Sequence, residues 1–151
     1  MRKLGLDDSI GFMLGIAHRK LSLLFMMRMK QYDITPEQWS VLYRIREQDG
    51  MIQKDIGDRA GKDKPTTTRI LDTLEAKGYI TKQLGKNDRR SFHVYITEQG
   101  IKAADEIALI EYQVVSDMSE VLAPDEYEHL AQLLIKISDH TTAWIEKEKE
   151  Q

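Results

Sequence analysis

Residues 63–100 constrain the fold of this chain more than any other stretch. They read DKPTTTRILDTLEAKG, then YITKQL, then GKNDRRS, then FHVYIT, and end in EQG. Pro65 near the start, apolar residues three and four apart, and a closing Lys77-Gly78 pair predict one helix. The alternation of apolar and polar residues over 92–96, after a polar and basic loop, predicts the returning strand of a short hairpin.

A shorter helix precedes this one along the chain. Residues 53–60 have helical spacing and are followed by Gly61, so they predict a helix that stops at a glycine. A helix, a turn containing glycine and a second helix form the helix-turn-helix pattern. With the hairpin added, the predicted fold class is mainly α with a small β-hairpin wing, which is a winged helix-turn-helix.

Longer helices are expected on both sides of this module. They are expected over residues 8–30, 35–47, 98–121 and 124–147, with Trp39, Leu42, Tyr43 and Ile45 turned largely inward. The first and the last two carry more apolar surface than a small module can cover, so a second copy of the chain is expected to cover it. The expected division is therefore a helical dimerisation region over 1–34 and 98–151, and a winged helix-turn-helix DNA-binding domain over 35–97.

The composition narrows the possible chemistry. The 151 residues include no cysteine, which excludes disulfides and thiolate metal sites and fits a reducing compartment. The N-terminus lacks the short apolar region and small-residue cleavage site of a secretory signal, and no apolar run is expected to reach the roughly 18 residues of a membrane span. The expected location is the cytoplasm.

The distribution of charge favours nucleic acid more than the net charge does. The whole chain carries −3, but the segment 54–90 holds 10 Lys and Arg against 6 Asp and Glu. A basic centre within an acidic frame can still neutralise phosphates locally. The basic segment is expected to face DNA, and the acidic parts to face away from it.

The helix over 63–78 and the loop after it supply the candidate DNA contacts. Hydroxyls and a guanidinium at a helix N-terminus can reach bases and phosphates, and a basic hairpin tip can reach a neighbouring groove. Asp63 is expected to cap the helix, and one of Gln53, Lys54 and Arg59 is expected to touch phosphate. The candidate DNA-binding residues are Lys62, Lys64, Pro65, Thr66, Thr67, Thr68, Arg69, Lys86, Asn87, Asp88, Arg89, Arg90 and Ser91.

Two segments resemble the MarR family of winged helix-turn-helix transcriptional regulators. The run DRRS over 88–91 and the later ITEQG over 96–100 are similar to the D-x-R wing signature of the family and the L-T-x-x-G that follows it, with Ile96 in place of Leu. The run TRILDTLEAKGYI over 68–80 is similar to the end of the recognition helix of the family and its exit into the sheet. The resemblance covers nearly the whole chain in the order and spacing of helices.

The resemblance implies a function and partners. Members are homodimers that bind palindromic double-stranded DNA with half-sites about one helical turn apart, mostly as repressors. Many are released by a small phenolic or other aromatic effector, whose pocket here would involve His18, Tyr43 and Arg46. Asp88 would pair with one arginine of the wing while Arg89 or Arg90 enters the minor groove. The members that sense peroxide use a cysteine, which this chain lacks.

Other functions find less support in the sequence. It has no G-x-S-x-G elbow, P-loop, H-E-x-x-H or dinucleotide fingerprint, so it is not expected to be an enzyme. Its four histidines lack close ligand spacing, so neither a metal nor another cofactor is expected. The remaining alternative is a winged-helix scaffold that pairs proteins without binding DNA, which would not require Arg69, Arg89 and Arg90.

Overall fold

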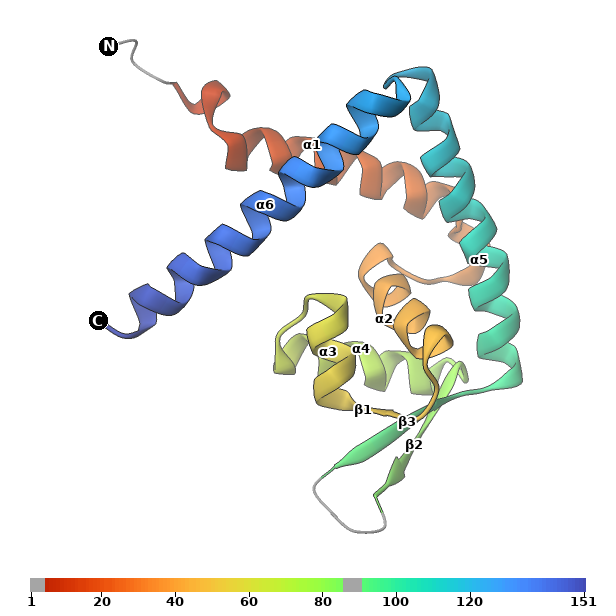
Figure 1. Cartoon of the computed structure of the whole chain (residues 1–151). Helices are drawn as coiled ribbons and strands as arrows, with labels where there is room; N and C mark the ends of the chain where they lie inside the picture. The colour runs from red at the N-terminus through yellow and green to blue at the C-terminus, as the bar shows by residue number, and fades with distance from the viewer. Residues whose placement is uncertain (1–4, 86–90) are drawn as a thin grey trace. The chain divides into compact units, whose positions relative to one another are not determined.

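The computed structural model describes residues 5–85 and 91–151 of the chain (Figure 1). Its elements in order are η1 (Leu6–Asp8), α1 (Ile10–Arg28), η2 (Lys30–Tyr32), α2 (Pro36–Glu47), β1 (Met51–Ile52), α3 (Gln53–Ala60), α4 (Lys64–Ala76), β2 (Ile80–Leu84), β3 (Phe92–Ile96), α5 (Glu98–Asp117), η3 (Met118–Glu120) and α6 (Pro124–Lys149). The chain divides into two compact units, one through Glu111 and one from Tyr112 onward. The mainly helical winged fold expected from the sequence is confirmed.

Local capping sets the ends of the central helices. The Thr35 side chain accepts from the Gln38 backbone, and Gln38 reaches back to the Thr35 backbone, which closes a capping box before α2. Gly61 ends α3 with φ of 67°, in the left-handed region that glycine adopts without strain. The predicted bounds of α3, residues 53–60, are confirmed. Its end is predictable because Gly61 is adjacent to it in the sequence.

The sheet holds one strand more than the predicted hairpin. Its order is β1-β3-β2, and both pairs are antiparallel. Strand β1 is only two residues long, with Met51 opposite Val94 and Ile52 opposite His93. A strand is predicted from alternating apolar and polar residues, and two residues are too few to show such alternation. Strand β1 is therefore defined only by its pairing with the distant strand β3.

One apolar core lies under α2, α3, α4 and the sheet. Apolar residues of these elements with no more than 1% of their surface exposed are Val41, Leu42, Ile45, Ile56, Ile70, Leu71, Leu74, Ile80 and Val94. Figure 1 shows α3 and α4 together at one edge of this unit, with the β2–β3 hairpin projecting beside them. The core therefore holds the helix-turn-helix and the wing as one body.

Two expectations need correction. The sequence places Tyr43 inward with Trp39, but 39% of its surface is exposed, because it lies on the outer side of the Trp39 ring at a centroid distance of 5.4 Å. The long helix expected over 98–121 ends at Asp117, and the 3-10 turn of Met118–Glu120 follows it.

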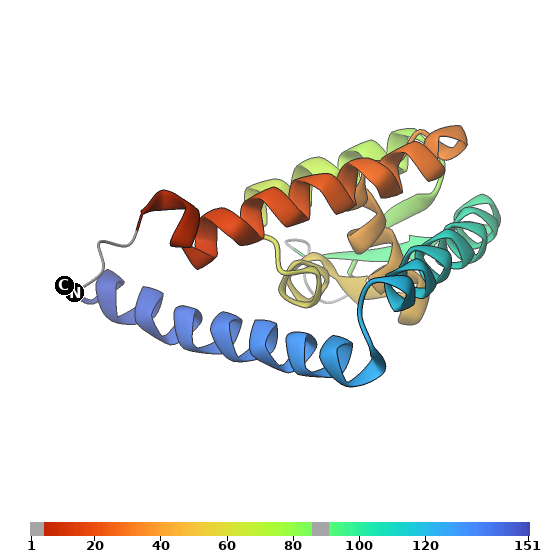
Figure 2. The same cartoon turned by 90° about the horizontal axis from the view of Figure 1, so that it is seen from above.

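Helix α1 has an unusual surface. Figure 2 shows it as one continuous helix, and Phe25 is its only buried residue. By length and mean hydropathy it would qualify as a membrane span, contrary to the expectation from the sequence. Arg19 and Lys20 lie at its midpoint, where charges are costly in a bilayer. An apolar helix with a charged centre is equally typical of a surface that packs against protein.

Candidate nucleic-acid interface

Asp63 fixes the first turn of α4. Its carboxylate accepts the Thr66 backbone N–H at 2.8 Å and caps the helix, as the sequence predicted. Hydrogen bonds from the Thr66 backbone, then from its side chain, hold the pKa of Asp63 below its ordinary value. Because the Asp63 carboxylate is bound to the start of α4, an acidic residue between Lys62 and Lys64 serves the helix and is compatible with a phosphate contact by its neighbours.

Thr67 belongs to the contact between the two helices rather than to an exposed face. It is 1% exposed, and its hydroxyl donates to the Asp63 carbonyl at 2.7 Å. It lies against Gly57 of α3, where a Cβ would come within 2.7 Å of Thr67 Oγ1. Thr67 also lines the cavity described below, but with 1% of its surface exposed its side chain is better placed for packing between the helices than for contact with a base.

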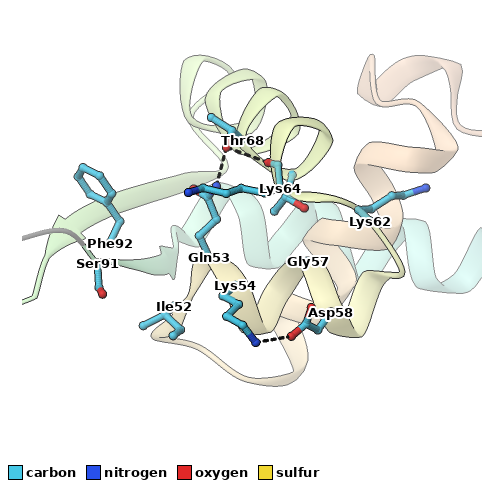
Figure 3. Close-up of a pocket in the computed structure, with 11 residues that line it drawn as sticks. Ile52, Gln53, Lys54, Gly57, Asp58, Lys62, Lys64, Thr68, Ser91 and Phe92 are labelled. Atoms are coloured by element: carbon cyan, nitrogen blue, oxygen red, sulfur yellow. Dashed lines mark hydrogen bonds and ion pairs between the residues drawn. The ribbon is translucent and has the colours of Figure 1, made fainter. Parts of the chain in front are cut away.

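Thr68 lies one residue further along α4 and is half-buried. Its hydroxyl donates to the Lys64 carbonyl at 2.9 Å and accepts from Nε2 of Gln53 at 2.5 Å (Figure 3). Gln53 is the first residue of α3, so this amide connects the starts of the two helices. The sequence suggested a phosphate contact for Gln53, but not this positioning role.

A cavity of about 620 Å³ opens between the start of α3, the turn into α4 and the start of β3. Lys54, Lys62 and Lys64 line it together with Gln53 and Thr68, as Figure 3 shows. Three lysines and one carboxylate, that of Asp58, thus line this concave surface beside the N-terminal half of α4, which leaves it net positive. Concentrated positive charge of this kind attracts phosphate.

The three lysines differ in their surroundings. Lys54 pairs with Asp58 one turn along α3 at 3.0 Å, and this hydrogen bond raises the pKa of Lys54. Both side chains are largely exposed, so the pair is weak and a phosphate can compete for the lysine. Lys62 and Lys64 flank the Asp63 cap on the same turn.

The two candidate arginines outside the wing have different roles. Arg69 is exposed and lies 3.8 Å from Glu37, an ion pair too exposed to hold the guanidinium in place. Arg59 instead donates to Gln48 at 3.0 Å and to Glu47 at 3.1 Å. Arg59 therefore joins α3 to the end of α2, whereas Arg69 makes the more exposed ion pair and is freer to reach DNA.

Most of the predicted wing contacts, Lys86, Asn87, Asp88, Arg89 and Arg90, lie outside the described residues. Ser91 is described and lines the cavity, next to Phe92 at the start of β3. The Gly85 N–H donates to the Ser91 carbonyl at 2.9 Å and closes the base of the hairpin. The base of the wing is thus placed beside α3 and α4.

Comparison with known proteins identifies this arrangement. The sequence model of the MarR family matches residues 34–92, which span α2, the α3–α4 pair and β2. The HTH-type transcriptional regulator SarZ of Staphylococcus haemolyticus is 27% identical over 129 residues, which cover 85% of this chain and 86% of that protein. Residues 34–92 thus match the MarR family of transcriptional regulators.

Solved structures extend the likeness over the whole MarR fold. The S. aureus MepR–DNA complex matches with a TM-score of 0.81 at 24% identity, covering 87% of this chain and 98% of that one. PcaV of Streptomyces coelicolor, solved with its natural ligand, matches with a TM-score of 0.83 at 21% identity, covering 92% and 98%. At these identities the likeness establishes the fold alone.

The residues suggested for an effector pocket in this chain lie in separate surroundings. His18 on α1 has its ring 3.5 Å from the Ser22 hydroxyl. Tyr43 lies against Trp39. Arg46 donates through both Nε and Nη2 to the Asp105 carboxylate of α5, at 2.9 and 3.3 Å. Each of the three side chains thus has a different neighbour, and the pocket stays a prediction.

Sequence reasoning missed three contacts that join the regulator's α2 region to α5. Arg46 with Asp105 is one, and the Tyr32 hydroxyl donates to Glu106 at 2.8 Å. Trp39 Nε1 donates to Glu111 at 3.1 Å. The partners lie 59 to 74 residues apart, and no local sequence pattern predicts such pairs.

Over residues 5–85 and 91–151, no three His, Asp or Glu side chains gather as a metal site.

Proposed function

We propose that this regulator acts as a homodimer on a palindromic operator, as a repressor that a small molecule releases. The N-terminal half of α4 enters the major groove, and the wing lies over the adjacent minor groove. The observation that carries this proposal is the cavity that gathers Lys54, Lys62 and Lys64 beside the exposed start of α4. In the related fold of MepR, a DNA complex is known.

The proposed contacts divide into two kinds. Lys54, Lys62 and Lys64 neutralise phosphates, which gives affinity without sequence preference. Thr66, Thr68 and Arg69 face the bases, and the wing residues 86–90 with Ser91 contribute the minor-groove contacts predicted from the sequence. Each phosphate that a lysine neutralises should add about 0.9 to the slope of log affinity against log salt concentration.

The exposed apolar surface supports the dimer. Helix α6 has no buried residue, and α1 buries only Phe25. Apolar residues of α6 with more than a third of their surface exposed are Tyr127, Leu130, Leu133, Leu134, Ile135, Ile137, Trp144 and Ile145. Two long helices with this much exposed apolar surface are typical of an interface, and a two-fold dimer would cover them.

The effector is the least defined partner. PcaV, which shares the fold, is known with its natural ligand. An aromatic or phenolic effector is proposed here, with His18, Tyr43 and Arg46 as the candidate pocket. Such a ligand would release DNA by binding more tightly to a dimer geometry that fits the operator poorly.

A fluorescence anisotropy titration tests the DNA-binding proposal. The probe is a duplex from the promoter region beside the gene of the protein, titrated at several salt concentrations against unrelated competitor DNA. Lys64→Gln should lower affinity and reduce the salt slope by about 0.9, because one phosphate is then no longer neutralised. Lys102→Gln is the matched control, because Lys102 is exposed on α5 and does not line the cavity.

Three results would count against parts of the proposal. Equal effects of the Lys64 and Lys102 substitutions would remove the cavity from the interface. Absence of competitor-resistant binding to the promoter and to duplexes selected from a random library would favour a scaffold without DNA binding. A monomer in sedimentation velocity at micromolar concentration would reject the dimer.

A further inference from the structure

We propose that Thr68 reads thymine through its methyl group, not through its hydroxyl. This inference rests on the proposed function, because it concerns what the start of α4 presents to the major groove. A threonine side chain offers a base either a hydrogen-bonding hydroxyl or an apolar methyl. In this structure the hydroxyl is already engaged within the protein.

The hydrogen bonds of the Thr68 hydroxyl leave little capacity for a base. A hydroxyl has one donor and two acceptor lone pairs. The donor goes to the Lys64 carbonyl at 2.9 Å, and one lone pair receives the Gln53 amide at 2.5 Å. Donation to a guanine or thymine oxygen would first require the bond to Lys64 to break. The second lone pair could accept only from a base amine, whereas the methyl on Cβ takes part in neither bond.

These bonds also fix the direction of the methyl. In a helix the threonine χ1 angle divides between two rotamers, because its hydroxyl can bond the carbonyl four residues earlier. The bond to Lys64 selects one of them, and Gln53 holds it from the neighbouring helix (Figure 3). Thr68 is half-buried and lines the cavity together with the three lysines, so these bonds hold its side chain in one orientation beside the surface proposed to face DNA.

The neighbouring threonines follow the same pattern. Thr67 is buried and donates to the Asp63 carbonyl at 2.7 Å. The Thr66 side chain bonds the Asp63 carboxylate, which contributes to the lowered pKa of that group. All three hydroxyls at the start of α4 therefore have partners inside the protein, and the methyl groups of this turn that are not fully buried belong to Thr66 and Thr68.

Thymine is the base that matches such a surface. In the major groove it is distinguished from cytosine partly by its C5 methyl, which side-chain methyls contact. Uracil lacks this methyl and keeps every hydrogen-bonding group of thymine. Replacing one contacted thymine by uracil should therefore weaken binding about fourfold, as expected for removing one buried methylene-sized group.

The test combines base and side-chain changes. Duplexes bound by the wild-type protein are selected from a random library, and each thymine of the tightest one is replaced by uracil in turn. Anisotropy then gives the affinity of the wild type, Thr68→Ser and Thr68→Val for each duplex. Thr68→Ser keeps the hydroxyl and both of its bonds but removes the methyl, whereas Thr68→Val keeps a methyl and removes the hydroxyl.

We expect at least one thymine per half-site whose replacement weakens the wild type about fourfold. That effect should vanish with Thr68→Ser and persist with Thr68→Val, even if Thr68→Val binds more weakly overall because Gln53 no longer has its acceptor. The inference is overturned if no thymine matters, if Thr68→Ser keeps the full sensitivity, or if Thr68→Val abolishes it. A wild type that selects no sequence at all rejects the proposed function instead.

Discussion

Gly57 of α3 packs tightly against Thr67 of α4, and Gly57→Ala should separate the two helices. A Cβ at this position would lie 2.7 Å from Thr67 Oγ1 and 3.3 Å from the Lys62 carbonyl. The Thr67 hydroxyl cannot rotate away freely, because it is 1% exposed and donates to the Asp63 carbonyl at 2.7 Å. One of the two helices must shift to accept the methyl group.

The magnitude follows from two opposing effects. Alanine in a helix interior is favoured over glycine by about 1 kcal/mol, whereas overpacking a filled site costs about 1–3 kcal/mol. Gly15→Ala gives the first effect alone within one protomer, since a Cβ at Gly15 has nothing of its own chain within 4 Å. Gly57→Ala should therefore be less stable than Gly15→Ala by about 1–3 kcal/mol, and it should bind DNA more weakly because the start of α4 has moved.

Urea denaturation followed by circular dichroism measures this difference, at one fixed protomer concentration because dimer formation would add to stability. Thr67→Ala provides the rescue: once Oγ1 is gone, the nearest remaining atoms are the Lys62 carbonyl and Cβ of residue 67, at 3.3 and 3.5 Å. Thr67→Ala should be destabilising in the wild-type background but less so, or even stabilising, in the Gly57→Ala background. The free energies of unfolding of the two variants should therefore differ from additivity by at least about 0.5–1 kcal/mol. The reasoning fails if Gly57→Ala and Gly15→Ala have the same free energy of unfolding. It also fails if Thr67→Ala lowers stability by the same amount in the wild type and in Gly57→Ala.

Three further predictions concern stability. Because hydrogen bonds from Thr66 lower the pKa of Asp63, the stability from this cap is fully present above the ordinary pKa and is lost as the pH falls through the lowered one. Asp63→Asn, which caps without titrating, should lose less stability than the wild type on acidification below about pH 5, as thermal midpoints would reveal. Tyr32→Phe removes the 2.8 Å hydrogen bond to Glu106 and should cost about 1 kcal/mol in urea denaturation, whereas an unchanged midpoint would make this bond irrelevant to stability. Gly100→Ala would place its Cβ onto the Tyr79 carbonyl oxygen, so it should abolish the cooperative unfolding transition, and a native-like transition would contradict this.

The sequence predicts those elements whose signals are local. Thr35, Gly61 and Asp63 each act within about four residues, and the helix ends that they define agree with the structure. Strand β1 is not predicted, because its two residues become a strand only by pairing with residues about 42 positions later. Long-range partners explain most of what sequence analysis missed.

The candidate site follows the same rule. The segment 62–69 is correctly placed on the turn and at the start of α4, because the helix start can be read from its own residues. The burial of Thr67 and the amide between Gln53 and Thr68 depend on how α3 crosses α4, which no spacing encodes. A run of three threonines therefore suggests three available hydroxyls, where the fold has engaged them all.

The two ends of α4 are held in different ways, and this difference matters for regulation. The start meets α3 through Thr67 and Thr68 and lies open beside the cavity. Beyond the other end, the Tyr79 hydroxyl donates to the Tyr32 carbonyl at 3.1 Å, while the Tyr32 hydroxyl donates to Glu106 of α5. A displacement of α5 at Glu106 must therefore break the Tyr32–Glu106 bond or carry the turn at Tyr32, and with it the end of α4. The surface proposed to read DNA is thus connected to α5 through Tyr79 and Tyr32.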